Sequence, residues 1–180
     1  MMSRGLDVSL RLTAVIGGVG LAFAAWDGPA RDLETTTLMT LIAPFAGSAH
    51  FVRLPGPHVL ITTRDAFPFI GTITPSCSAL GAVLAFASVA ALVLRGPALR
   101  RAYGFALAAG LCVAANLVRI GAALVIGAHY GREAMVTFHD WGGTGFGLLA
   151  LFGGFVLLLR AMLPSLNSLL DAGPTTPGTM

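Results

Sequence analysis

The chain has 180 residues, of which 56% are hydrophobic and 11% are charged. Soluble domains carry about 25% charged residues, so this composition disfavours a soluble globular protein. The net charge of +3 includes no basic run with interleaved aromatic residues, which excludes a nucleic-acid-binding surface. Two cysteines exclude a disulfide framework and a CxxC metal site. The sequence therefore predicts an all-α integral membrane protein.

About four segments are apolar and long enough to cross a bilayer, which needs about 20 mostly apolar residues. In chain order they are 8–25, 77–94, 102–128 and 141–163. The segment 26–75 is expected outside the bilayer. Its apolar stretch 37–46 is too short to span and predicts an interfacial helix. The turn residues that follow predict a small hairpin before the second span.

The arginines mark one side of this predicted arrangement. Arg4 and Arg11 lie before or at the start of the first span, Arg95, Arg100 and Arg101 lie between the second and third, and Arg160 lies near the end of the fourth. The positive-inside rule assigns that side to the cytoplasm. We therefore expect both termini in the cytoplasm and the segment 26–75 outside the cell (inner) membrane. Residues 1–170 are expected to form a single membrane domain, followed by a disordered tail over 171–180.

Arg119 lies in the outer third of the third span. An arginine at the centre of a spanning helix costs roughly 2.5–3.5 kcal/mol, so such a charge needs a reason. Either its long side chain reaches the interface and anchors the helix, or it serves a functional site. Asn116 lies three residues earlier and therefore shares its helical face.

Cys77 lies at the outer start of the second span, beside Ser78. A helix N-terminus favours a thiolate and makes Cys77 a candidate nucleophile, although a lone cysteine is more often an inert packing residue. Cys112 lies deeper, among apolar residues of the third span, and is expected to pack. The two cysteines are expected at different depths, which disfavours a disulfide between them.

His139 is expected just before the fourth span, beside Asp140 and a tryptophan. It is either an ordinary interfacial histidine or part of a site, and Asp140 either orients its imidazole or caps the helix. The histidines lack ligand spacing with a carboxylate, so neither a metal nor another cofactor is expected. The arginine-based topology nevertheless puts Cys77, Arg119 and His139 at one membrane face. A thiol, a guanidinium and an imidazole are the groups needed to attack a carbonyl and stabilise the resulting anion.

Three blocks in this order, PSCSAL (75–80), NLVRI (116–120) and FHDWGG (138–143), resemble the exosortase/archaeosortase family of protein-sorting enzymes. The likeness covers roughly 37–163. Ala79 stands where the family usually has glycine, and many members have more N-terminal spans.

This resemblance implies a membrane thiol protease, a hydrolase or transpeptidase in which Cys77 attacks, His139 protonates the leaving amine and Arg119 holds the thiolate or the oxyanion. Asn116, Ser78 and Asp140 would support them. The implied substrates are exported proteins that end in a short motif, a transmembrane helix and a basic tail. Cleavage would occur at the outer membrane face through a thioester, with transfer to a cell-envelope acceptor. The residues do not choose between water and an amine as acceptor, and they leave the recognition motif and the oligomeric state open.

A second class of protein fits the same composition. A non-enzymatic membrane subunit, or a small transporter-like protein, would use Arg119 to bind an anion or a partner helix. A family member that only binds substrate tails is a third possibility. The non-enzymatic subunit or transporter-like protein has no use for the Cys77 thiol, so replacing Cys77 with serine separates it from the enzyme.

Overall fold

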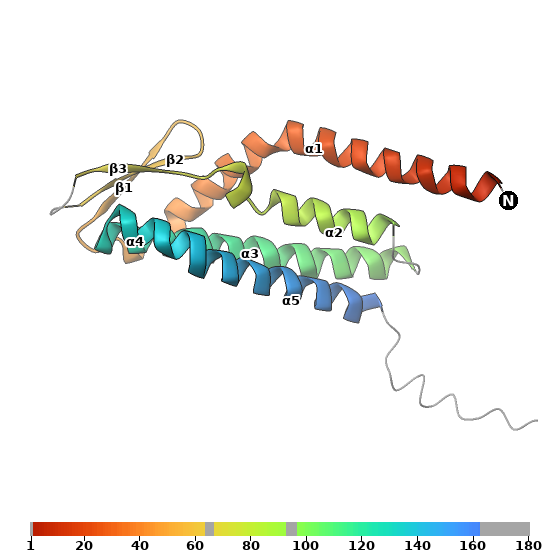
Figure 1. Cartoon of the computed structure of the whole chain (residues 1–180). Coiled ribbons are helices and arrows are strands. Elements are labelled where there is room, and N and C mark those ends of the chain that lie inside the picture. Colours follow the sequence, from red (N-terminus) through yellow and green to blue (C-terminus); the bar gives the residue numbers. More distant parts are fainter. Residues whose placement is uncertain (1, 64–66, 93–96, 163–180) are drawn as a thin grey trace, which may run out of the picture.

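The computed structural model describes residues 2–63, 67–92 and 97–162 (Figure 1). The helices are α1 (Met2–Ile42), α2 (Leu80–Leu92), α3 (Ala98–Tyr130), α4 (Arg132–Thr137) and α5 (Thr144–Met162), and the strands are β1 (His50–Leu54), β2 (His58–Thr62) and β3 (Phe69–Thr72). The long helices lie side by side, and α3 packs against α1, α2 and α5. The sheet and α4 lie at the end of this bundle that is opposite the N-terminus (Figure 1).

Three helical runs are long and apolar enough to cross a membrane, namely Leu12–Phe45, Ala98–Tyr130 and Arg132–Ala161. Helix α2 is apolar but has 13 residues, and at 1.5 Å per residue it covers about 20 Å of a core about 30 Å thick. The last two residues of the predicted second span, 93–94, lie outside the described residues, as does the expected tail. Within the described part of the chain, three full-length runs and one shorter helix therefore stand where about four spans are expected.

Helix α1 differs most from the sequence-based prediction. It continues unbroken to Ile42, so residues 26–42 are helical and the stretch 37–46 is not a separate interfacial helix. The helix passes through Pro29, and an ion pair of 2.6 Å between Arg31 Nη2 and Asp27 Oδ2 brackets that turn. Leu38 is fully buried in the core that α1 shares with α3. Tertiary packing thus extends the helix past the point where hydropathy alone ends it.

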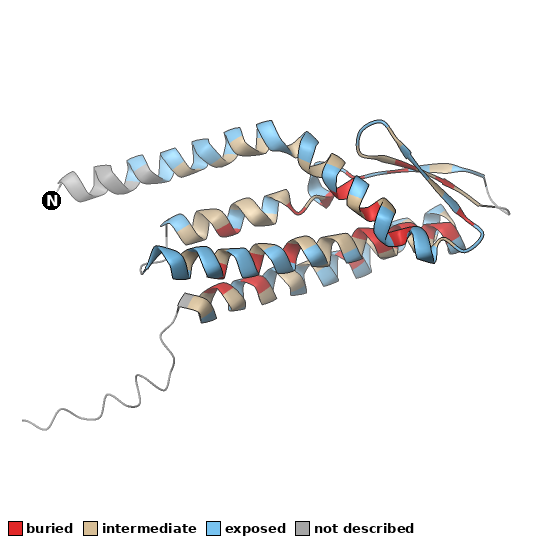
Figure 2. Ribbon diagram, turned by 180° about the vertical axis from the view of Figure 1, so that it is seen from behind, coloured by how far each residue is buried: buried red, intermediate tan, exposed pale blue. Residues whose placement is uncertain are grey.

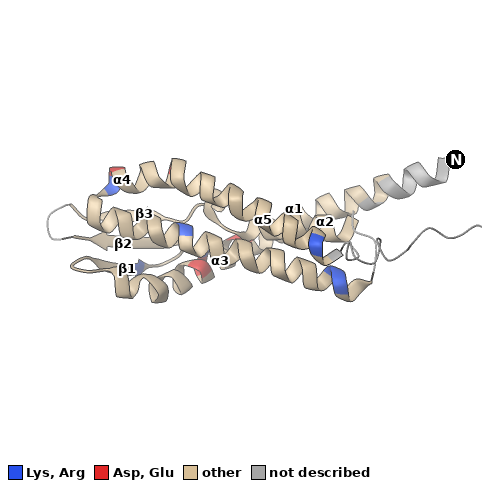
Figure 3. Ribbon diagram, turned by 90° about the horizontal axis from the view of Figure 1, so that it is seen from below, with Lys and Arg blue, Asp and Glu red and all other residues tan. Residues whose placement is uncertain are grey.

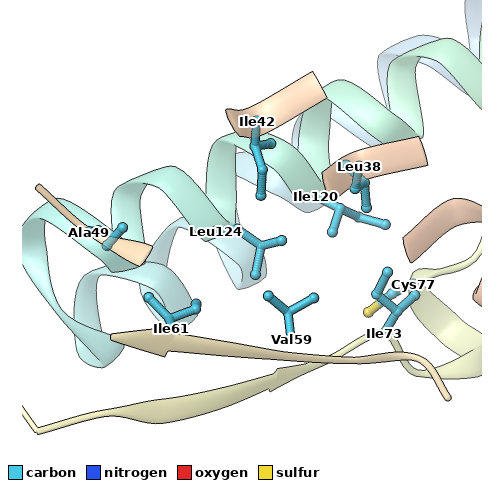
Figure 4. Packing of buried hydrophobic residues seen from close by; sticks show 10 residues of the cluster. Leu38, Ile42, Ala49, Val59, Ile61, Ile73, Cys77, Ile120 and Leu124 are labelled. Carbon is cyan, nitrogen blue, oxygen red and sulfur yellow. The ribbon is translucent and has the colours of Figure 1, made fainter. Parts of the chain in front are cut away.

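The expected two-stranded hairpin is a three-stranded antiparallel sheet with the order β1-β2-β3. Alternate side chains of a strand point to opposite faces, and in β2 Val59 and Ile61 are the buried pair. They face Leu124 of α3 and the end of α1 (Figure 4). This core also contains Cys77, so the thiol belongs to the best-packed part of the molecule.

A smaller core lies farther along the bundle. Phe86 of α2, Ala108 and Cys112 of α3 and Leu158 of α5 form it. Buried residues are concentrated along α3 and in the C-terminal part of α1, whereas the N-terminal part of α1 exposes its side chains (Figure 2). Such an exposed apolar helix has the surface expected of one that faces lipid.

Candidate active site

Cys77 ends a short 3₁₀ helix (Pro75–Cys77) between β3 and α2. Its backbone N–H donates to the carbonyl of Thr74 over 2.9 Å, and the hydroxyl of Thr74 donates to Sγ over 3.1 Å. The residue is 7% exposed. Because α2 begins only at Leu80, Cys77 is not its first residue, and the expected helix N-terminus at the thiol is wrong. The neighbours of the thiol are instead side chains.

His139 comes from a π-helical segment (Phe138–Gly143) between α4 and α5. Its Nε2 lies 3.1 Å from Cys77 Sγ. Its Nδ1 lies 3.2 Å from Asp140 Oδ1. Because helical residues run from Arg132 to Ala161, His139 does not precede the fourth span, and Asp140 does not cap its start. Instead, Asp140 contacts the imidazole of His139, and a carboxylate in that position holds the orientation of the ring.

Arg119 of α3 points its guanidinium at the same turn. Nη2 donates to the carbonyl oxygen of Cys77 over 3.0 Å and to Asn116 Oδ1 over 2.9 Å. Its Nε is buried and has no hydrogen-bond partner among the described residues. The stem of Arg119 lies against Gly143, where a Cβ would be in ordinary van der Waals contact with Arg119 Cγ at 3.4 Å. Arg119 is thus bound to the cysteine turn, which a side chain that only anchors the helix at the interface does not need.

Glu34 of α1 is a member of the site that the sequence reasoning missed. It is 9% exposed, and its Oε1 accepts from the backbone N–H of Ala79 over 2.8 Å, from Ser78 Oγ over 3.3 Å and from Asn116 Nδ2 over 3.4 Å. Its Oε2 is buried without a partner in the described ranges. Glu34 and Arg119 therefore share Asn116, and together they hold the turn that carries Cys77.

The signal for Glu34 was present in the sequence. It is followed by TTTLMTLIA (35–43), a run without charge. If that run is taken as helix, the carboxylate lies in an apolar span and carries the same penalty that singled out Arg119. Treating 26–75 as an extracytoplasmic segment made Glu34 look like an ordinary surface charge.

Cys77 and His139 both line a cavity of about 220 Å³ between the sheet, α3 and α4. A second cavity, of about 420 Å³, lies over α3 between α2 and α5 and is lined by Arg119, Asn116 and Ser78 at one end and by Cys112 and Leu151 at the other. Cys77 lines the first cavity, and its neighbours Ser76 and Ser78 line the second.

Cys112 lies away from the reactive pair. It is free, as Cys77 is, and its Sγ donates to the carbonyl of Ala150 over 3.6 Å within the smaller core. In the described part of the chain, no group of three or more His, Cys, Asp or Glu side chains is placed to hold a metal ion. The side chains that meet around Cys77 are a thiol, an imidazole and a guanidinium, with the carboxylates of Glu34 and Asp140 beside them.

These features define a helical membrane protein with a thiol–imidazole pair at one end of its bundle. The family model of the transmembrane exosortases matches residues 67–159, just over half of the 180-residue chain. The chain belongs to the transmembrane exosortase family and is a multi-pass membrane protein. The matched range contains Cys77, Arg119 and His139, whereas Glu34 lies before it. No curated protein and no solved structure matches the chain.

Proposed function

We propose that this protein is a cysteine endopeptidase or transpeptidase that cleaves C-terminal sorting signals of exported proteins. The observation that carries the proposal is the distance of 3.1 Å between Cys77 Sγ and His139 Nε2. A nucleophile and its base within hydrogen-bond reach, with a third group orienting the base, is the arrangement used in covalent acyl transfer. Membership of the exosortase family supports the same class of activity.

In the proposed reaction His139 takes the proton of Cys77 as Sγ attacks the scissile carbonyl carbon. An S–C bond forms and the electron pair of the carbonyl moves to its oxygen. When the tetrahedral intermediate collapses, the C–N bond breaks and His139 gives its proton to the leaving amine. The product is a thioester on Cys77. Water or an acceptor amine then attacks the thioester, His139 takes up its proton, and the thiol is restored when the S–C bond breaks.

Arg119 has two roles in this proposal. Through Nη2 it fixes the carbonyl of Cys77, which keeps the nucleophile in position. The guanidinium also stabilises the developing oxyanion in this proposal. Asn116 and Ser78 take part by holding Arg119 and the turn, and Asp140 by holding His139.

The proposed orientation puts the site on the extracytoplasmic face of the cytoplasmic membrane. Arg100 and Arg101 begin α3 and Arg160 lies near the end of α5, and basic residues appear at that end of the bundle (Figure 3). The N-terminus of α1 lies at the same end (Figure 1). The positive-inside rule makes this end cytoplasmic, so both termini are inside and the substrate is met after export.

The test is the rate at which Cys77 reacts in intact cells with a membrane-impermeant maleimide, in a Cys112→Ala background. We expect labelling from outside, and a rate lower by about a hundredfold in His139→Ala because the thiol loses its base. The matched control is His129→Ala, since His129 contacts the carbonyl of Phe45 rather than the thiol. Labelling only after permeabilisation would overturn the orientation, and equal rates in the two histidine variants would overturn the nucleophile.

A further inference from the structure

We propose that the cavity beside Cys77 is a binding pocket for one apolar side chain of the substrate, that of the residue whose carbonyl Cys77 attacks. The pocket has this role only if Cys77 is the nucleophile proposed above. The cavity is bounded by β2, by the stretch from Gly71 to Thr74, by α3 and by α4, with Cys77 and His139 in its wall. Any group that enters it therefore comes into contact with the reacting atoms.

The lining of the cavity is aliphatic. Val59, Ile73, Ile120 and Leu124 are buried core residues, and Met135 packs against the same core. An apolar cavity does not hold water firmly, because a bound water needs several polar partners. An apolar side chain that moves from water into the cavity displaces no hydrogen-bonded group. Its burial is therefore favourable.

The volume limits what the cavity can hold. About 220 Å³ exceeds the share of several water molecules, each about 30 Å³. It is below the roughly 300 Å³ at which pockets for complete small ligands begin. One branched or aromatic side chain fits this range. The polar groups in the wall are Thr72, Thr74, Asp140 and the reactive pair, and Asp140 disfavours an acidic side chain.

The position of Cys77 indicates which substrate residue places its side chain in the cavity, namely the residue on the acyl side of the scissile bond. After the amine leaves, that residue remains bonded to Sγ of Cys77, and Cys77 lines the cavity. Its side chain therefore has the shortest path into the cavity, both in the attack and in the thioester. The second cavity, which contains Arg119 and lies toward the bundle, is separate from this pocket and leaves room for the rest of the substrate.

The experiment measures alkylation of Cys77 in the full-length protein, in a Cys112→Ala background, by two chloromethyl ketones. One is derived from N-acetyl-leucine and the other from N-acetyl-glycine, and in both the thiolate displaces chloride and forms an S–C bond. We expect the leucine probe to react faster by about tenfold or more, since one missing methylene in an apolar pocket is worth 10- to 200-fold.

Two variants with opposite effects test the pocket itself. Ala123→Leu fills it from α3, because Ala123 is buried in its wall, and should bring the two rates together. Met135→Ala enlarges the pocket and should raise the rate of the corresponding phenylalanine probe relative to the leucine probe. Ala114→Leu is the matched control, because Ala114 is exposed on the same helix, and it should leave the leucine preference intact.

The outcomes separate this pocket from the proposed nucleophile. Methyl methanethiosulfonate, which has no side chain, reports whether Cys77 is folded and reactive in every variant. If Cys77 reacts quickly with that reagent but equally with both amino-acid probes, the pocket is wrong and the nucleophile stands. An unchanged leucine preference in Ala123→Leu also overturns the pocket. If the parent protein reacts with every reagent as slowly as His139→Ala does, Cys77 is not an activated nucleophile. The pocket proposal then fails as well.

Discussion

The two ends of the helix bundle are built differently. At the sheet end, ten buried residues of the described chain form one core, which comes from α1, α3, the sheet and the segments next to it and includes Cys77. Farther along, the smaller core has four, and the most apolar window of α1 has none of its residues buried. The sheet end is packed like the interior of a soluble protein, whereas the other end leaves most of its surface for lipid.

Because of this difference, the reactivity of Cys77 and the stability of the bundle should depend on different ends of the molecule. The positions of the thiol, the imidazole and the guanidinium depend on the larger core and on the hydrogen bonds around Glu34. At the other end the helices approach through small residues, as is usual where lipid supplies no hydrophobic driving force between helices. A change at the sheet end should therefore alter the rate at which Cys77 reacts, and a change at the other end should alter only the resistance to unfolding.

The largest expected effect belongs to Arg119→Gln. This change removes the cation beside Cys77 and leaves the buried carboxylate of Glu34 uncompensated. We expect the rate of Cys77 alkylation to fall by about a hundredfold, the lower part of the range for the loss of an anion-stabilising donor. Arg160→Gln, at the exposed end of α5, is the control and should leave the rate unchanged. If Cys77 in Arg119→Gln is alkylated within about twofold of the rate in the parent, the reactivity of Cys77 does not depend specifically on the sheet end.

Glu34→Gln is expected to have an intermediate effect. The amide oxygen can still accept from Ala79, but the charge that balances Arg119 is lost. A hydrogen bond to a charged group is worth about 1.5–3 kcal/mol, and weakening one of them should slow alkylation of Cys77 by about tenfold.

Asp32→Asn is the matched control for Glu34→Gln. Asp32 lies two residues earlier and binds Arg53 at 2.5 Å on the exposed side of α1. Its replacement should leave the alkylation rate as it is. Equal rates for the two variants would mean that the charge of Glu34 does not contribute to the position of Cys77.

The smallest effect on reactivity is expected for Gly154→Ala at the other end. A Cβ there would lie 2.8 Å from Phe86 Cζ, so the ring must move. Such overpacking costs about 1–3 kcal/mol of unfolding free energy, which should lower the midpoint of thermal unfolding in detergent while the alkylation rate stays the same. At Gly145 a Cβ meets nothing within 4 Å, so Gly145→Ala should leave the alkylation rate unchanged and should not lower the midpoint. Slower alkylation in Gly154→Ala would show that the two ends are coupled.

Composition and hydropathy predicted the features that are determined by short stretches of sequence. They gave the helical membrane class and located most of α2, α3 and α5, because lipid demands long apolar helices. The meeting of Cys77 with His139 was a hypothesis from topology, and the structure brings the two residues together. That they act in catalysis is still a prediction.

What the sequence did not reveal depends on contacts between distant segments. The extension of α1 past Pro29 requires the partners of Leu38 and Ile42 in α3, and the burial of Glu34 follows from that extension. The third strand pairs Leu60 with Ile70, and Pro68 before it marks a break in the chain without indicating which strands pair. The π-helical segment around His139 leaves no periodic pattern, since it is only six residues long.

That π-helical segment has a consequence for how the chain can change in evolution. A π-helical turn contains more residues than an α-helical one, so the rotational position of His139 relative to α5 is determined by a residue count. Loss of a single codon between His139 and Thr144 would favour α-helical pairing and turn the imidazole by about 100° relative to α5. Point substitutions do not alter that count. The length of this segment should therefore be inherited more strictly than the identity of most residues in it.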